Sequence, residues 1–158
     1  MSELLYAIGR ALISVIFIVS GIEHFIGVQS LADNIAAANL PLPAQVQQYL
    51  PIPQHLALGY LVAAVEVIAG LLVLVGLLTR LAAVVLFVFC ALTIAFIHHF
   101  WNMEGPAQVA NQIHALKNLA LMGGLLLLTA KGAGGYSFDG AGEHSTGAGH
   151  ATPAAQAS

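Results

Sequence analysis

The sequence has few charged residues. Only 7% of its 158 residues are Asp, Glu, Lys or Arg, whereas a soluble domain has about 25%. Because 59% of the residues are hydrophobic, too little polar surface remains to cover one small soluble core. The composition therefore predicts an integral membrane protein with a single transmembrane domain in contact with the lipid bilayer. Nucleic-acid binding is excluded, because the net charge is −3 and such binding needs a basic surface.

Cysteine is almost absent. The single cysteine, Cys90, lies in the middle of an apolar run, so no internal disulfide can form. The sequence also contains no CxxC or other zinc-binding motif, and we predict no metal site. Cys90 is interpreted as a small hydrophobic residue.

Long apolar runs are what the sequence has instead. Four of them, at residues 4–22, 56–78, 81–97 and 113–130, approach the roughly 20 residues that a bilayer crossing needs. We predict an all-α fold in which residues 1–139 form a four-helix transmembrane bundle. Residues 140–158, rich in Gly, Ala and His, are predicted to be a disordered tail. A cleaved signal peptide is the alternative for the first run, but the Ala run at 36–38 lies too far downstream for a usual cleavage site.

The connections differ in length. Residues 25–55 are predicted to form a partly helical outer loop at the membrane surface, with a short helix near 30–40 before several prolines. Residues 79–80 are predicted to be a tight turn and residues 99–112 a polar loop. Arg10, Arg80 and Lys131 would then share one side of the membrane, while the two larger loops contain no Lys or Arg. By the positive-inside rule, both termini are predicted to be cytoplasmic.

Helical projection places the polar residues of the spans on stripes. The stripe of the first span contains Arg10, Ser14, Phe17, Gly21 and His24. That of the second span contains Gly59, Ala63, Glu66 and Gly70. In the fourth span His114, Lys117 and Asn118 share a face. Because small residues allow helices to approach closely, we expect the first two stripes to face the bundle interior.

Two ionisable residues lie inside the predicted spans. Glu66 is expected near the middle of the bilayer, where a carboxylate exchanges protons or binds a ligand. The structural alternatives are a neutral acid, or an ion pair with Arg10 or Lys117. Lys117 is expected one or two turns from the outer end of its span, where a side chain can also reach the membrane surface without binding anything.

Histidines cluster at the outer ends of the predicted helices: His24, His55, His98, His99 and His114. Such residues titrate near neutral pH, bind metals, ligate haem or hydrogen-bond a quinone carbonyl. The alternative is that they lie at the membrane surface with one polar end in water. No pair has a spacing diagnostic of a metal site, and His24, His98 and His114 together are the strongest candidates for function.

In these segments the chain resembles the DoxX family over about residues 5–139. The resemblance lies in Arg10 and Gly21 before Phe25; Glu66 with Gly70, Gly76, Thr79 and Arg80; residues 98–101, 116–120 and 123–126; and Gly132, Gly134, Tyr136, Ser137 and Asp139. The order and spacing of these segments together make the match fairly specific.

The resemblance implies a small four-helix protein of a bacterial-type inner membrane that is linked to oxidoreductase chemistry. One branch of the family resembles a subunit of thiosulfate:quinone oxidoreductase, and other members are associated with redox systems as membrane partners of soluble enzymes. Because the sequence contains no recognisable electron-carrier motif, a soluble or membrane redox partner is expected, and self-association into a homo-oligomer is a further expectation.

The first hypothesis is a membrane subunit that interacts with quinone or a small sulfur substrate. Its candidate catalytic residues are Glu66, His98, His114 and Lys117, and its candidate binding residues are Arg10, His24, Trp101 and Asn118. Haem is a weaker cofactor candidate than quinone. The second hypothesis is a non-catalytic membrane anchor for a soluble redox enzyme, and a third is a pathway for protons or small molecules.

Overall fold

The computed structural model describes residues 1–38, 40 and 43–140. The predicted disordered tail therefore lies outside the described residues, apart from Gly140. Within the described ranges the chain is helical and forms no strand.

Four helices are long and apolar enough to cross a membrane: α1 (Ser2–Ile26), α3 (Gln54–Val75), α4 (Thr79–Phe96) and α5 (Gly105–Lys131). The short helix η2 (Phe100–Asn102) follows α4. The connection between α1 and α3 contains α2 (Val28–Ala37) and the single-turn helix η1 (Ala44–Tyr49). The all-α, four-span architecture with a partly helical connection is thus confirmed.

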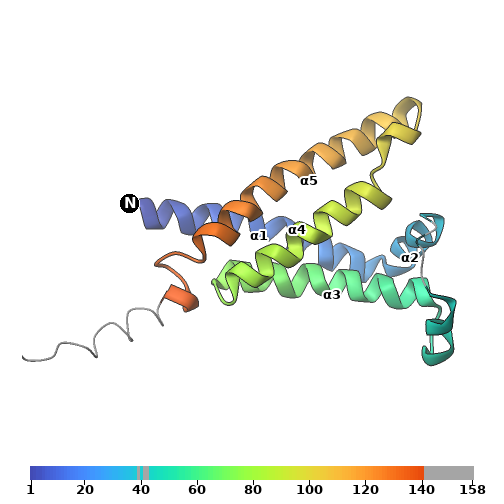
Figure 1. The fold of residues 1–158 in the computed structure, drawn as a ribbon, viewed down its shortest axis with the longest axis horizontal. Helices are drawn as coiled ribbons and strands as arrows, with labels where there is room; N and C mark the ends of the chain where they lie inside the picture. Colours follow the sequence, from blue (N-terminus) through green and yellow to red (C-terminus); the bar gives the residue numbers. More distant parts are fainter. Residues whose placement is uncertain (39, 41–42, 141–158) are drawn as a thin grey trace, which may run out of the picture.

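The helices pack as two antiparallel pairs. α1 lies along α3 and α4 lies along α5, and the two pairs diverge toward the end that carries α2 and η2 (Figure 1). Phe17 of α1, Val73 of α3, Leu86 of α4 and Leu125 of α5 meet in the buried core. Large apolar side chains cover the outside, as expected for a surface that contacts lipid.

Glycines set the distance between α1 and α3. A Cβ at Gly21 would lie 2.7 Å from Val67 Cγ2 and 2.9 Å from Glu66 Cβ, so only glycine fits at this crossing. The buried residues of α1 are Arg10, Ser14, Phe17 and Gly21. This stripe of α1 and the Glu66 stripe of α3 therefore face the interior as predicted.

The two ends of the bundle differ. We call the end with Ser2, Val75, Thr79 and Lys131 the Arg80 end, and the opposite end, with α2 and η2, the His98 end. At the Arg80 end the turn between α3 and α4 spans residues 76–78, so the prediction of a turn at 79–80 was wrong. The reason is that Gly76 ends α3 at φ +74°, a conformation that glycine adopts easily, and Thr79 already begins α4.

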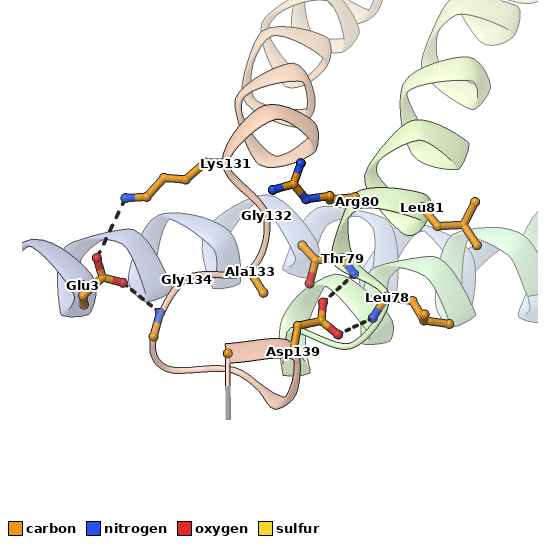
Figure 2. A pocket seen from close by; sticks show the side chains of 12 residues that line it. Glu3, Leu78, Thr79, Arg80, Leu81, Lys131, Gly132, Ala133, Gly134 and Asp139 are labelled. Carbon is orange, nitrogen blue, oxygen red and sulfur yellow. Dashed lines mark hydrogen bonds and ion pairs between the residues drawn. The ribbon is translucent and has the colours of Figure 1, made fainter. Parts of the chain in front are cut away.

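The segment after α5 folds back over this turn. The Asp139 carboxylate accepts hydrogen bonds of 3.0 Å each from the Leu78 and Thr79 amides (Figure 2). These amides lack partners within α4 because they lie at its first turn. The segment 132–140 thus caps α4 and closes the Arg80 end.

The start of α5 also differs from the prediction. The helix begins at Gly105, so residues 105–112, predicted to be part of a polar loop, are helical. Pro106 stands in the first turn, where its missing N–H costs nothing and its fixed φ favours the helix. The apolar run therefore marks only the inner part of a longer helix.

Candidate functional site

Glu66 lies near the middle of α3 and is only 2% exposed. Its carboxylate oxygen Oε2 lies 2.5 Å from His24 Nδ1 of α1, and the His24 side chain is 35% exposed. The pair therefore joins a buried carboxylate to a ring that reaches the surface. Such a pair can hold one proton between two sites and exchange it with the surroundings through His24.

Neither Arg10 nor Lys117 is the partner of Glu66, so the ion pairs considered as a structural alternative are not formed. The backbone of Gly21 lies against Glu66, and this contact fixes the position of α1 along α3. His24, about one turn further along α1, is therefore within reach of the Glu66 carboxylate. Arg10 lies roughly 16 Å from Gly21 along the helix axis, beyond the reach of its side chain.

Arg10 instead serves the Arg80 end. Its buried guanidinium donates hydrogen bonds to the carbonyl oxygens of Ala133, of Tyr136 at 2.6 Å and of Leu74 at 3.4 Å. These bonds tie α1 to the end of α3 and to the segment after α5. The structure thus separates Arg10 from the other candidate residues.

Three of the predicted residues come together at the His98 end. The rings of His98 and His114 stack with centroids 5.0 Å apart and an interplanar angle of 18°. His98 Nδ1 lies 3.0 Å from Asn111 Oδ1, and Lys117 Nζ lies 3.4 Å from His114 Nδ1. This His98 cluster, made of His98, Asn111, His114 and Lys117, places polar groups of α4 and α5 side by side.

The remaining two candidates are near this cluster but have other contacts. Asn118 donates a 2.9 Å hydrogen bond to Thr93 Oγ1 and so links α5 to α4. Trp101 is 55% exposed, and its ring contacts those of His99 and Phe100 rather than the cluster. Trp101 thus lies at the rim of the His98 end, where amphipathic rings are common at membrane surfaces.

Lys117 also lines a groove between α1 and α5, with a volume of about 380 Å³. The α1 side of the groove presents Leu12, Val15, Ile16, Val19, Ser20 and Glu23. The groove therefore has an apolar wall and a polar end, whose lining includes the ammonium of Lys117, the carboxylate of Glu23 and the hydroxyl of Ser20. We call it the α1/α5 groove.

The groove and the Glu66–His24 pair are neighbours on α1. Ser20 and His24 are four residues apart, so their side chains lie next to each other along the helix. Among the described residues no hydrogen bond or ion pair joins Glu66 to the His98 cluster, so the expected single Glu/His/Lys cluster is divided into two sites. In the same part of the chain, no group of three or more His, Cys, Asp or Glu side chains is arranged to hold a metal ion.

Sequence reasoning missed Asn111 and Ser20. Asn111 was assigned to a loop, and a helix started at Pro106 would have placed it three residues before His114 on the same face. Ser20 has no signal of its own in the sequence, because only the packing of α5 against α1 makes its face a groove.

The DoxX family model matches residues 5–99 of the chain. The chain belongs to the DoxX family. A second family model, described as the SURF4 family, matches residues 55–144.

Two relatives are similar to this DoxX-family chain over most of their length. Inner membrane protein YphA of Escherichia coli (strain K12) is 34% identical over 137 residues, which is 85% of this chain and 88% of the relative. Inner membrane protein YqjF of the same strain is 32% identical over 135 residues, 84% of this chain and 87% of the relative. No solved structure matches the chain at a significant level.

Proposed function

We propose that this DoxX-family membrane protein is a subunit of an oxidoreductase system and binds a quinone in the α1/α5 groove. The observation that carries the proposal is the groove itself, where apolar side chains of α1 adjoin Lys117, Ser20 and Glu23. A quinone has an apolar body and polar carbonyl oxygens, so its two parts match the two parts of the groove. A molecule dissolved in the bilayer would enter from the side.

Each residue has a defined role in this proposal. Lys117 donates a hydrogen bond to a carbonyl oxygen, and His114, with its ring nitrogen 3.4 Å from Lys117 Nζ, orients the ammonium. The Glu66–His24 pair holds a proton one turn from Ser20 and delivers it to the polar end of the groove. Reduction of a quinone takes two electrons and two protons. A partner protein with its own redox centre supplies the electrons, and the Glu66–His24 pair delivers the protons in turn, taking up the second from the surroundings through His24.

The test of the groove is the binding of a short-chain quinone to the purified protein in lipid nanodiscs. Replacing a charged hydrogen-bond donor costs roughly 1.5–3 kcal/mol, so Lys117→Met should weaken binding about tenfold or more. The matched control is Lys131→Met, which removes the same charge at the Arg80 end and should bind like the wild type. Equal affinity in all three proteins would contradict the proposal. Competition by thiosulfate for the same variant-sensitive site would instead indicate a small sulfur substrate.

A second candidate function, a non-catalytic anchor for a soluble redox enzyme, is favoured by the burial of Glu66. A carboxylate that is 2% exposed and bound to His24 across the α1/α3 contact would lock two helices together. The variant Glu66→Gln separates the two functions in membranes that contain the partner. Intact assembly with loss of quinone reduction supports the quinone-binding subunit, whereas release of the partner or unfolding supports the anchor.

We also propose a bacterial inner membrane as the location, with both termini in the cytoplasm. The names of the two relatives support the membrane, since both are described as inner membrane proteins. The orientation is supported by Arg10, Arg80 and Lys131 at the Arg80 end, because basic residues favour the cytoplasmic side.

A further inference from the structure

A larger hollow lies at the Arg80 end, away from the α1/α5 groove. It has a volume of about 700 Å³ and is lined by the start of α4, the end of α5, Glu3 of α1 and the segment 132–140 (Figure 2). Because α4 begins and α5 ends here, a bilayer around the four spans would place the hollow at the depth of the lipid head groups.

Three cations lie in or directly behind the hollow. Arg80 and Lys131 line it, and Arg10 lies behind the segment 132–140, bound to the carbonyl oxygens of Ala133 and Tyr136. These are three of the four Lys and Arg residues in the chain. In the lining itself Arg80 and Lys131 equal the two carboxylates, Glu3 and Asp139, in number, and Arg10 adds one positive charge behind the segment.

Arg80 has its hydrogen-bond donors available. Across the described ranges of the chain, its side chain makes no hydrogen bond or ion pair, and it lies beside the backbone of Gly132 (Figure 2). Any side chain at residue 132 would crowd it, because a Cβ there would be 3.2 Å from Arg80 Nε and would be strained at φ +85°. An exposed guanidinium with free donors presents a planar set of N–H groups that matches the oxygens of a phosphate.

The other charged groups of the hollow are partly occupied. Lys131 Nζ lies 4.0 Å from Glu3 Oε1 and 4.1 Å from the centroid of the Tyr6 ring. Glu3 Oε2 also accepts a 2.8 Å hydrogen bond from the Gly135 amide, and Asp139 accepts the two bonds that cap α4. The amide hydrogen bonds stabilise both carboxylates without removing their charge. Arg80, which has no such partner among the described residues, is left as the main contact for an anion and Lys131 as the second.

We propose that this hollow binds the phosphate group of an anionic phospholipid, with Arg80 as its main contact. The same chemistry would recognise a free phosphate ion, but the rim favours a lipid. Leu78 and Leu81 line the hollow and are 56% and 61% exposed, so an apolar surface for the acyl chains lies next to the cationic site. Basic pockets at the ends of transmembrane helices bind anionic head groups in this way. This site is independent of quinone binding.

The test is native mass spectrometry of the full-length protein in mild detergent with added phosphatidylglycerol or phosphatidylcholine. The wild type should retain phosphatidylglycerol in clear preference to phosphatidylcholine. One basic residue near a charged lipid surface contributes about fivefold in affinity, so Arg80→Gln should lower phosphatidylglycerol binding about fivefold or more. Arg80→Lys, which keeps the charge, should restore part of it. The matched control is Lys117→Gln, which removes one positive charge in the α1/α5 groove and should leave the lipid preference unchanged.

Each result decides a point. Equal retention of the two lipids by the wild type overturns the proposal without any variant, and so does an equal loss in Arg80→Gln and Lys117→Gln. If an excess of inorganic phosphate displaces phosphatidylglycerol from the wild type but not from Arg80→Gln, the result supports the same phosphate site with a soluble anion as its ligand. Resistance to inorganic phosphate, with the preference for phosphatidylglycerol intact, supports the lipid.

Discussion

Among single residues, Asp139 has a clear electrostatic role. Burial raises the pKa of its carboxyl, but hydrogen bonds from the Thr79 and Leu78 amides and the charge of Arg10 outweigh burial and hold that pKa below the ordinary value of 3.8. Since the folded-state pKa is the lower one, ionised Asp139 stabilises the fold at neutral pH. This contribution begins to fall near pH 3.8 and is lost as the pH passes below the folded-state pKa.

Asp139→Asn keeps one acceptor oxygen but loses the charge and the second acceptor. We therefore expect it to lower the free energy of unfolding by about 1 kcal/mol at pH 7, the usual net contribution of one hydrogen bond. Thermal unfolding in mild detergent at a series of pH values measures the difference, which should shrink below about pH 3.8. The control is Asp33→Asn, because Asp33 is exposed and accepts a single hydrogen bond of 3.1 Å from Gln29. If the loss of unfolding free energy in Asp139→Asn stays constant down to low pH, the proposed role of the Asp139 charge is contradicted.

The partner of Glu66 shows what a sequence can predict for one residue. The helical period places Glu66 and the stripe of α1 in the interior, and the structure agrees. The helical period of the sequence does not define the position of α1 along the axis of α3. It therefore allows either Arg10 or His24 to face Glu66. The contact of the Gly21 backbone with Glu66 decides between them, and this contact exists only in the packed helices.

At the scale of the helices, the α1/α3 contact depends on the absence of a side chain at residue 21. In Gly21→Ala the new methyl would meet Val67, Glu66 Cβ and the Ala63 carbonyl oxygen within 3.0 Å, and two of these groups belong to or adjoin the helix backbone. We expect a loss of about 1–3 kcal/mol in the free energy of unfolding, as for other overpacked cores. Denaturation of the detergent-solubilised protein by increasing SDS would measure it.

The matched control for this prediction is Gly123→Ala in α5. A Cβ at Gly123 has no neighbour within 4 Å, and alanine favours a helix more than glycine by roughly 1 kcal/mol in water. This variant should therefore be as stable as the wild type or more stable. If the two alanine variants are destabilised equally, then close packing at Gly21 is not what holds α1 against α3.

The extents of the helices were predictable only in part. Apolar runs located all four spans, because a bilayer demands a continuous apolar length. The polar first turns of α5 carry no such signal, and only Pro106 marks the true start near Gly105. The His98 cluster was predicted as a group of residues at one depth, but its inclusion of Asn111 follows from this longer helix.

In the whole molecule, ionisable groups are sorted between the two ends. Arg10, Arg80 and Lys131 gather at the Arg80 end with the segment 132–140, while the connections at the His98 end contain no Lys or Arg. The Glu66–His24 pair and the α1/α5 groove lie between the Arg80 end and the connections of the His98 end. The two proposed ligands, a quinone and a lipid phosphate, would thus occupy separate parts of one small bundle.

This sorting predicts the orientation of the molecule in the membrane. Single cysteines introduced as Ser2→Cys at the Arg80 end and Gln108→Cys at the His98 end lie at exposed positions, whereas the native Cys90 is buried and serves as the unlabelled background. If the Arg80 end is cytoplasmic, a membrane-impermeant maleimide added to the outside of a cell's inner membrane should label Gln108→Cys at once. Ser2→Cys should react only after the membrane is made permeable. The reverse pattern would place the cationic hollow outside the cytoplasm, and labelling of both cysteines in intact membranes would contradict the odd number of crossings, by α1, α3 and α4, between them.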